Sequence, residues 1–157
     1  MTSVFVETSI VSYLRQRQSQ DIVTAARQIQ TQRWWSEKRS DYELFASILV
    51  VEEASRGDEA LAAERLRVLS DLPLLAVNEE VVSVGNALVD RAALPEKARV
   101  DALHISTAAF HGVNYLLTWN CKHIANARMR PKIERILREM DCAVPVICTP
   151  DELLDDE

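Results

Sequence analysis

Short apolar runs alternate with longer amphipathic stretches along this chain. Five runs rich in valine, leucine, isoleucine and aromatic residues predict β-strands at 3–6, 42–46, 74–77, 115–118 and 144–148. Between them, apolar residues recur at helical spacing, as at Ile22, Ala25, Ala26 and Ile29. This alternation predicts an α/β fold with three layers, in which helices cover both faces of a central, mostly parallel five-stranded sheet.

Local signals mark where two of the helices begin. Ser47 can cap a helix that follows the second strand, and the Thr149 to Glu152 segment fits a capping box with proline at the first helical position. The last helix is expected to be short, because only Leu153 and Leu154 can dock it. Without internal repeats or a linker-like stretch, the sequence predicts a single domain over 1–157, with a short acidic tail at 151–157.

The composition is that of an ordered globule. The chain has 157 residues, 48% of them hydrophobic, with only three glycines and five prolines, which suits one domain with a sizeable core. No apolar run approaches the roughly 20 residues needed to span a bilayer, and the first residues lack the basic region of a signal peptide. We therefore expect a cytoplasmic protein without a membrane partner.

The net charge of −6 argues only weakly against a nucleic-acid partner. The tail DELLDDE contributes five acids and no base, so the remainder has 24 − 5 = 19 acids against 18 bases, a charge of −1. Three cysteines without a CxxC pair disfavour both a disulfide framework and a structural zinc site, so we interpret them as packing residues.

Four polar residues follow predicted strands or lie just inside the next helix: Glu7, Glu53, Asp101 and Asn120. The carboxyl ends of parallel strands meet at one crevice, so residues scattered over more than a hundred positions can share one site there. Unpaired buried carboxylates are costly, and a cluster of them most simply implies a bound divalent cation.

The neighbours of these four residues leave several interpretations open. Thr8 and Ser9 either start a helix or offer hydroxyls to the site. Glu52 and Glu53 point about 100° apart on a helix, so only one can face the crevice. His104 lies one turn after Asp101 and could be its neighbour at the site, but it is interpreted as a structural histidine, because no second nitrogen ligand stands at metal-binding spacing.

Four motifs in this order resemble the PIN-domain family, specifically the VapC-like ribonuclease toxins of type II toxin–antitoxin pairs. They are VFVETSIVSYL, SILVVEEASRGD, DALHISTAA and LLTWNCKHIAN, and the likeness covers nearly the whole chain. The resemblance implies a PIN-like fold and a metal-dependent ribonuclease. It also implies a cognate antitoxin as partner and a homodimer.

Carried over residue by residue, the resemblance places the catalytic positions at Glu7, Glu53, Asp101 and Asn120. Mg²⁺ or Mn²⁺ would be held by Glu7, Glu53 and Asp101, while Asn120 positions water or a weaker second ion. Contacts with the RNA substrate are expected from four further residues: Thr8, Ser9, Arg99 and Lys122.

Two positions depart from the commonest family pattern. The first acid is usually Asp, and Glu7 is one methylene longer; the fourth is often Asp, and Asn120 carries no charge. A degenerate PIN-like module that binds RNA or a protein partner without cleavage is therefore the alternative. A metal-dependent phosphatase is disfavoured, because no Asp-x-Asp pair follows the first strand.

Overall fold

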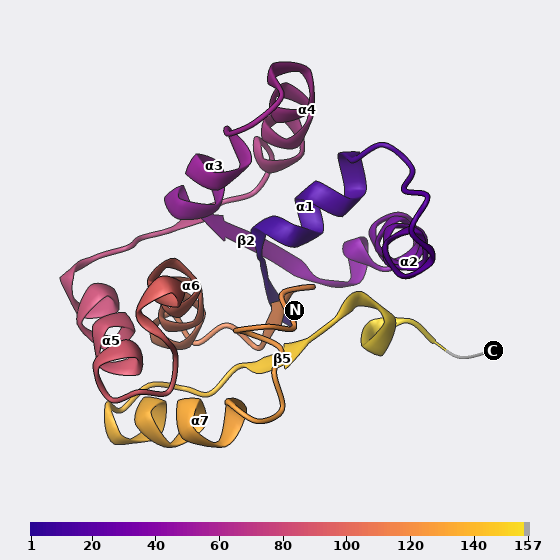
Figure 1. Ribbon diagram of the computed structural model, residues 1–157. Coiled ribbons are helices and arrows are strands. Elements are labelled where there is room, and N and C mark those ends of the chain that lie inside the picture. Colours follow the sequence, from indigo (N-terminus) through magenta and orange to yellow (C-terminus); the bar gives the residue numbers. More distant parts are fainter. Residues whose placement is uncertain (156–157) are drawn as a thin grey trace.

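The computed structural model describes residues 1–155, which form a three-layer α/β/α fold around a five-stranded parallel sheet (Figure 1). The strands are β1 (Ser3–Val6), β2 (Glu43–Ser47), β3 (Leu74–Leu75), β4 (Tyr115–Leu117) and β5 (Val146–Cys148). Their order across the sheet is β3-β2-β1-β4-β5, and every neighbouring pair is parallel. The fold class and all five strands predicted from the sequence are confirmed.

Helices cover both faces of this sheet. In chain order they are α1 (Thr8–Arg15), α2 (Ile22–Glu37), α3 (Ile48–Ala54), α4 (Glu59–Leu69), α5 (Glu79–Asp90), α6 (Arg99–Phe110) and α7 (Arg130–Glu139). The first four lie on one side of the sheet and the last three on the other (Figure 1). Helices α5 and α6 pack closely at Gly85, where any side chain would collide with Leu103.

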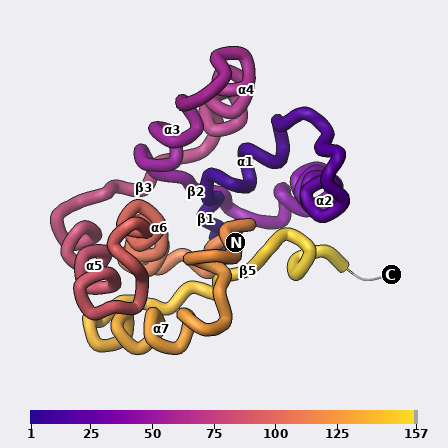
Figure 2. The backbone as a smooth tube through the Cα atoms, in the orientation of Figure 1, coloured from indigo at the N-terminus to yellow at the C-terminus, as the bar shows by residue number. Residues whose placement is uncertain are grey.

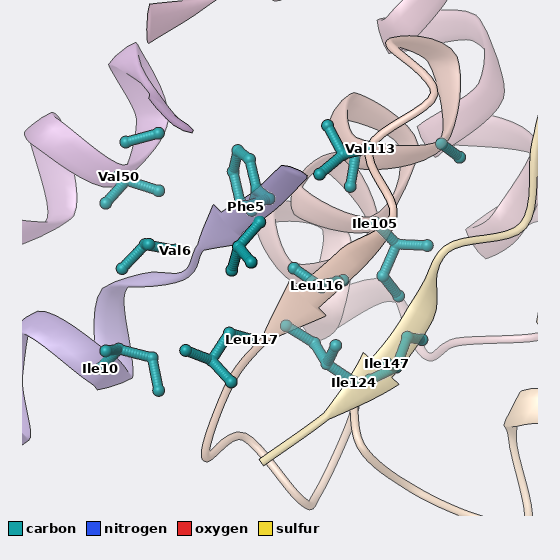
Figure 3. Packing of buried hydrophobic residues seen from close by; sticks show 14 of the residues in the cluster. Phe5, Val6, Ile10, Val50, Ile105, Val113, Leu116, Leu117, Ile124 and Ile147 are labelled. Atoms are coloured by element: carbon teal, nitrogen blue, oxygen red, sulfur yellow. The ribbon is translucent and has the colours of Figure 1, made fainter. Parts of the chain in front are cut away.

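The central strand β1 lies in the core, and its last three residues are fully buried. Figure 3 shows Phe5 and Val6 of β1 beside Leu116 and Leu117 of β4, with Ile105 of α6 nearby. Such continuous apolar strands are typical of parallel sheets that are covered on both faces. Burial of the strands leaves only their ends for polar chemistry.

Local chemistry explains where the observed strands differ from the predicted ones. β5 begins at Val146 rather than two residues earlier, because Pro145 has no N–H to donate to a neighbouring strand. β3 shortens to two residues at the edge of the sheet, where only one neighbour, β2, pairs with it.

The C-terminal segment is tied to the body of the protein. The capping box at Thr149 is present, but it starts a short 3-10 helix, η3 (Pro150–Leu153), rather than an α-helix. This segment packs beside α2 (Figure 2), and Lys38 forms an ion pair with Asp155. The rest of the predicted acidic tail, 156–157, lies outside the described residues.

The strand order contains one topological switch point. From β1 the chain builds outward through β2 to β3, then crosses the sheet to β4 and continues to β5 on the other side. In open α/β sheets, ligands bind at the carboxyl ends of the strands at such a point. The fold therefore places a site where β1 and β4 end side by side.

In the described part of the chain, no helix has the length and apolar character to cross a membrane.

Candidate active site

Glu7 stands at the switch point, immediately after β1. Its side chain is only 4% exposed, and its Oε1 accepts hydrogen bonds of 2.5 Å from the hydroxyls of Ser9 and Thr118. Burial raises the pKa of Glu7, although the charge of His104 and the two hydroxyl bonds act in the opposite direction. A carboxylate in this place carries a charge that its surroundings only partly compensate.

Glu53 approaches Glu7 from α3. That helix begins directly after β2, where the Ser47 side chain accepts a hydrogen bond from Val50 N and so caps it. Oε1 of Glu53 accepts hydrogen bonds of 2.6 Å from the Thr8 hydroxyl and from His104 Nε2. Its neighbour Glu52 is exposed, so the structure turns Glu53 rather than Glu52 toward the end of β1.

Burial by itself would raise the pKa of Glu53. The hydrogen bond and charge of His104, together with the Thr8 hydroxyl, outweigh burial and bring the pKa below its usual value. The two glutamates therefore differ in kind. Glu53 is held ionised by its partners, whereas Glu7 gives up its proton less readily.

His104 lies in α6 and is fully buried against these acids. Ligand atoms of Glu7, Glu53 and His104 all lie within 4.8 Å of one another. Burial alone would lower the pKa of the ring, but its bond to Glu53 and the charges of the surrounding carboxylates raise it. From the sequence, His104 was a possible neighbour of Asp101, one helical turn away, but a structural role was favoured and its contact with Glu53 was not foreseen.

Asp101 lies in the first turn of α6, beside this cluster rather than within it. Its Oδ2 lies 2.9 Å from Nδ1 of His123, a residue of the loop that follows β4. The Asp101 side chain is 19% exposed, and its charge contributes to the raised pKa of His104. The structure thus brings Asp101 to the carboxyl-terminal side of the sheet, where the glutamates lie, with His123 as its hydrogen-bond partner.

Asn120 shapes the loop after β4. Its Oδ1 accepts a hydrogen bond of 3.1 Å from His123 N, and its own N–H donates to the Thr118 hydroxyl at 2.9 Å. The Asn120 side-chain oxygen therefore holds the turn that presents His123 to Asp101. That is a connection along the loop, which the sequence alone did not reveal.

The four residues expected to touch substrate separate into two groups. The hydroxyls of Thr8 and Ser9 lie inside the site, where they donate to Glu53 and Glu7. The Arg99 guanidinium is engaged by Glu96, Asp90 and Asn86, so it can reach a ligand only by exchanging those partners. Lys122 is exposed and has no carboxylate partner within residues 1–155.

The donor set fits a divalent cation. Both hydroxyl bonds to Glu7, and both side-chain bonds to Glu53, end on Oε1, which leaves Oε2 of each carboxylate without a side-chain donor among residues 1–155. Carboxylate oxygens are preferred ligands of Mg²⁺ and Mn²⁺. The charge of Glu7, disfavoured by its burial, gives a cation a further electrostatic reason to bind here.

Parallel strands, a switch point and converging carboxylates define an α/β protein with a candidate metal centre. The model of the PIN domain family matches residues 4–128, so the chain belongs to that family. A chain of the same fold occurs in the solved structure of VapBC2 from Rickettsia felis, which is bound to a DNA fragment from the VapBC2 promoter. The two chains are 14% identical, with a TM-score of 0.59 over 94% of this chain and 98% of that one. No curated protein matches the chain.

Proposed function

We propose that this protein is a metal-dependent endoribonuclease and the toxin of a toxin–antitoxin pair. The observation that carries the proposal is the cluster of Glu7 and Glu53 around His104 at the carboxyl end of β1, where the strand order reverses, with Asp101 one helical turn before His104. These three acids are the proposed ligands of Mg²⁺ or Mn²⁺. Membership of the PIN domain family supports the choice of nuclease over other metal-dependent hydrolases.

Each part of the site has a distinct task in this proposal. The bound cation supplies neutralisation of phosphate charge and activation of water for attack on phosphorus. The Ser9 and Thr118 hydroxyls fix the Glu7 carboxylate, and Thr8 does the same for Glu53. Asn120 holds the loop after β4 in place, and Lys122 at its exposed edge can contact the RNA backbone.

The proposed protein partners are an antitoxin and a second copy of the chain in the cytoplasm. The solved structure with the same fold is a VapBC2 assembly, which supports an antitoxin partner. Helix α2 also exposes three large apolar side chains, Ile22 at 85%, Val23 at 59% and Ile29 at 56%. Apolar groups gathered on one exposed helix are a feature of surfaces that bind other proteins.

The test is cleavage of a structured RNA by the purified protein, with Mn²⁺ or with EDTA. We expect cleavage only with metal, and a fall to background in Asp101→Asn. The matched control is Asp71→Asn. Asp71 is exposed and precedes β3, so it lies at the amino-terminal ends of the strands, whereas the site lies at their carboxyl ends. Metal-independent cleavage, or equal activity of both variants, would contradict the proposal. RNA binding without cleavage by the wild type would favour the degenerate module.

A further inference from the structure

Two acids of the candidate site each face a histidine ring. Nε2 of His104 lies 2.6 Å from Oε1 of Glu53, and Nδ1 of His123 lies 2.9 Å from Oδ2 of Asp101. An ionised carboxylate has no hydrogen to donate, so in both pairs the ring N–H is the donor. The two pairs therefore use opposite nitrogens of the imidazole ring.

We propose that His104 and His123 are positioning residues, each of which fixes one carboxylate so that its other oxygen faces the metal. The inference rests on the proposed metal site and adds two residues to it. A carboxylate held through one oxygen cannot rotate freely, so its second oxygen keeps one direction. Partners of metal ligands that act in this way typically change metal affinity or activity by about 10-fold to 100-fold.

The surroundings of His104 support this role. The ring is fully buried, with its centroid 6.1 Å from that of Phe5. Its Nδ1 has no hydrogen-bond partner within residues 1–155, so the bond to Glu53 is the ring's only hydrogen bond there. An apolar side chain could fill the same space without leaving a buried nitrogen unpaired. The one hydrogen bond that requires a histidine here is therefore the one to Glu53.

His123 is positioned by its own backbone. Its N–H donates to Oδ1 of Asn120, which fixes the first turn of the loop after β4. The ring then reaches across to Asp101 at the start of α6, and its side chain is only 12% exposed. The uncharged Asn120 thereby contributes to the orientation of Asp101 through the intervening histidine.

The use of opposite nitrogens allows a crossed test with amide side chains. The amide nitrogen of glutamine stands about where Nε2 of histidine does, and that of asparagine about where Nδ1 does; both donate N–H. His104→Gln and His123→Asn therefore preserve the donor, whereas His104→Asn and His123→Gln misplace it. The third histidine, His111, contacts the carbonyl of Ala76 outside the site and supplies the control pair, His111→Gln and His111→Asn.

The measurement is Mn²⁺ affinity of the full chain, from the free Mn²⁺ signal in electron paramagnetic resonance. We expect His104→Gln and His123→Asn to stay within about threefold of wild type, and the other two site variants to bind Mn²⁺ about 10-fold to 100-fold more weakly. Both His111 variants should match wild type. RNA cleavage at limiting Mn²⁺ should follow the same order.

Two results would overturn the inference while leaving the proposed function intact. Equal affinity of glutamine and asparagine variants at both positions would show that the rings orient nothing. Loss of affinity in all four site variants would show that imidazole itself is required, as a metal ligand would be. Thermal melting in EDTA checks that each variant folds. If His104→Asn does not fold, the comparison of His123→Asn with His123→Gln decides, because His123 is partly exposed. A wild type that binds no Mn²⁺ and cleaves no RNA would instead refute the proposed function, and this inference with it.

Discussion

The hydroxyl of Thr118 donates a hydrogen bond of 2.5 Å to Oε1 of Glu7, across 111 positions of sequence. Glu7 follows β1 and Thr118 follows β4, the two strands that meet at the switch point of the sheet. The bond therefore joins the two strand ends that carry the candidate site. Around the buried Glu7 carboxylate, the support comes from neutral hydroxyls and from the charge of His104.

The raised pKa of Glu7 predicts how its replacement changes stability. Because the folded state holds the proton more tightly than the unfolded chain, the contribution of Glu7 is fully present below pH 4.5 and is lost as pH rises through the folded-state pKa. In EDTA at pH 7.5, we expect Glu7→Gln to be more stable than wild type, with a smaller difference at pH 5.

Urea unfolding at the two pH values measures this difference. Glu52→Gln is the control, because Glu52 is exposed and its replacement should change neither value. Saturating Mn²⁺ should reverse the order and favour wild type, since a ligand stabilises the form that binds it. Greater stability of wild type in EDTA at pH 7.5 would argue against a costly buried charge at Glu7.

The orientation of α3 separates its two adjacent glutamates. Glu53 contacts Thr8 and His104, whereas Glu52 is exposed. We expect Glu53→Gln to lower cleavage of a structured RNA by about 10²-fold or more, the scale for loss of a positioned catalytic group, and Glu52→Gln to stay near wild type. Initial cleavage rates at saturating Mn²⁺ measure both, and the reverse ordering would transfer the role to Glu52.

Asn120 allows a test of whether the site lacks one charge. An aspartate at this position can still accept the hydrogen bond from His123 N, and it adds a carboxylate oxygen to the loop that presents His123 to Asp101. We expect Asn120→Asp to increase RNA cleavage, most strongly at low metal concentration, where an added ligand matters most. A titration of cleavage rate against Mn²⁺ measures the effect.

Asn126→Asp is the matched control for this substitution. Asn126 lies in the same loop, and its Oδ1 likewise accepts a backbone hydrogen bond, from Arg128 N. Asn126→Asp changes the charge of the loop by the same amount without adding a carboxylate oxygen at position 120. An equal gain in both variants would assign the effect to loop charge, and no gain in either would remove Asn120 from the metal site.

A buried bond ties the loop after β4 to α2. Trp119 Nε1 donates to the Thr31 hydroxyl at 2.7 Å, and both side chains are buried. We expect Thr31→Val to lower the free energy of unfolding by about 1–3 kcal/mol, because it leaves a buried N–H without an acceptor. Urea unfolding of Thr31→Val, Trp119→Phe and the double variant measures the coupling, and strictly additive effects would contradict it.

Hydrophobic periodicity was enough to find the elements of this fold. The strand predicted at 3–6 has the observed bounds, and the other four lie within two residues of theirs at each end. Parallel strands buried on both faces form continuous apolar runs, so they contrast sharply with the amphipathic helices between them. Only β3 and β5 are clearly shorter than predicted. β3 is shortened at the edge of the sheet, and β5 is shortened by a proline whose effect on pairing depends on which neighbour is present.

The sequence by itself determined the order of the elements and the set of polar residues at the strand ends, because both depend on local pattern and on the parallel topology that the pattern implies. The tertiary structure alone decided which side chains meet. Glu53 and His104 are 51 positions apart, and Asp101 and His123 are 22 apart. Rotation of a helix by one residue would exchange Glu53 for Glu52, and local spacing cannot fix that rotation. Packing of α3 and α6 against the sheet fixes it, and with it the hydrogen bonds that orient the acids.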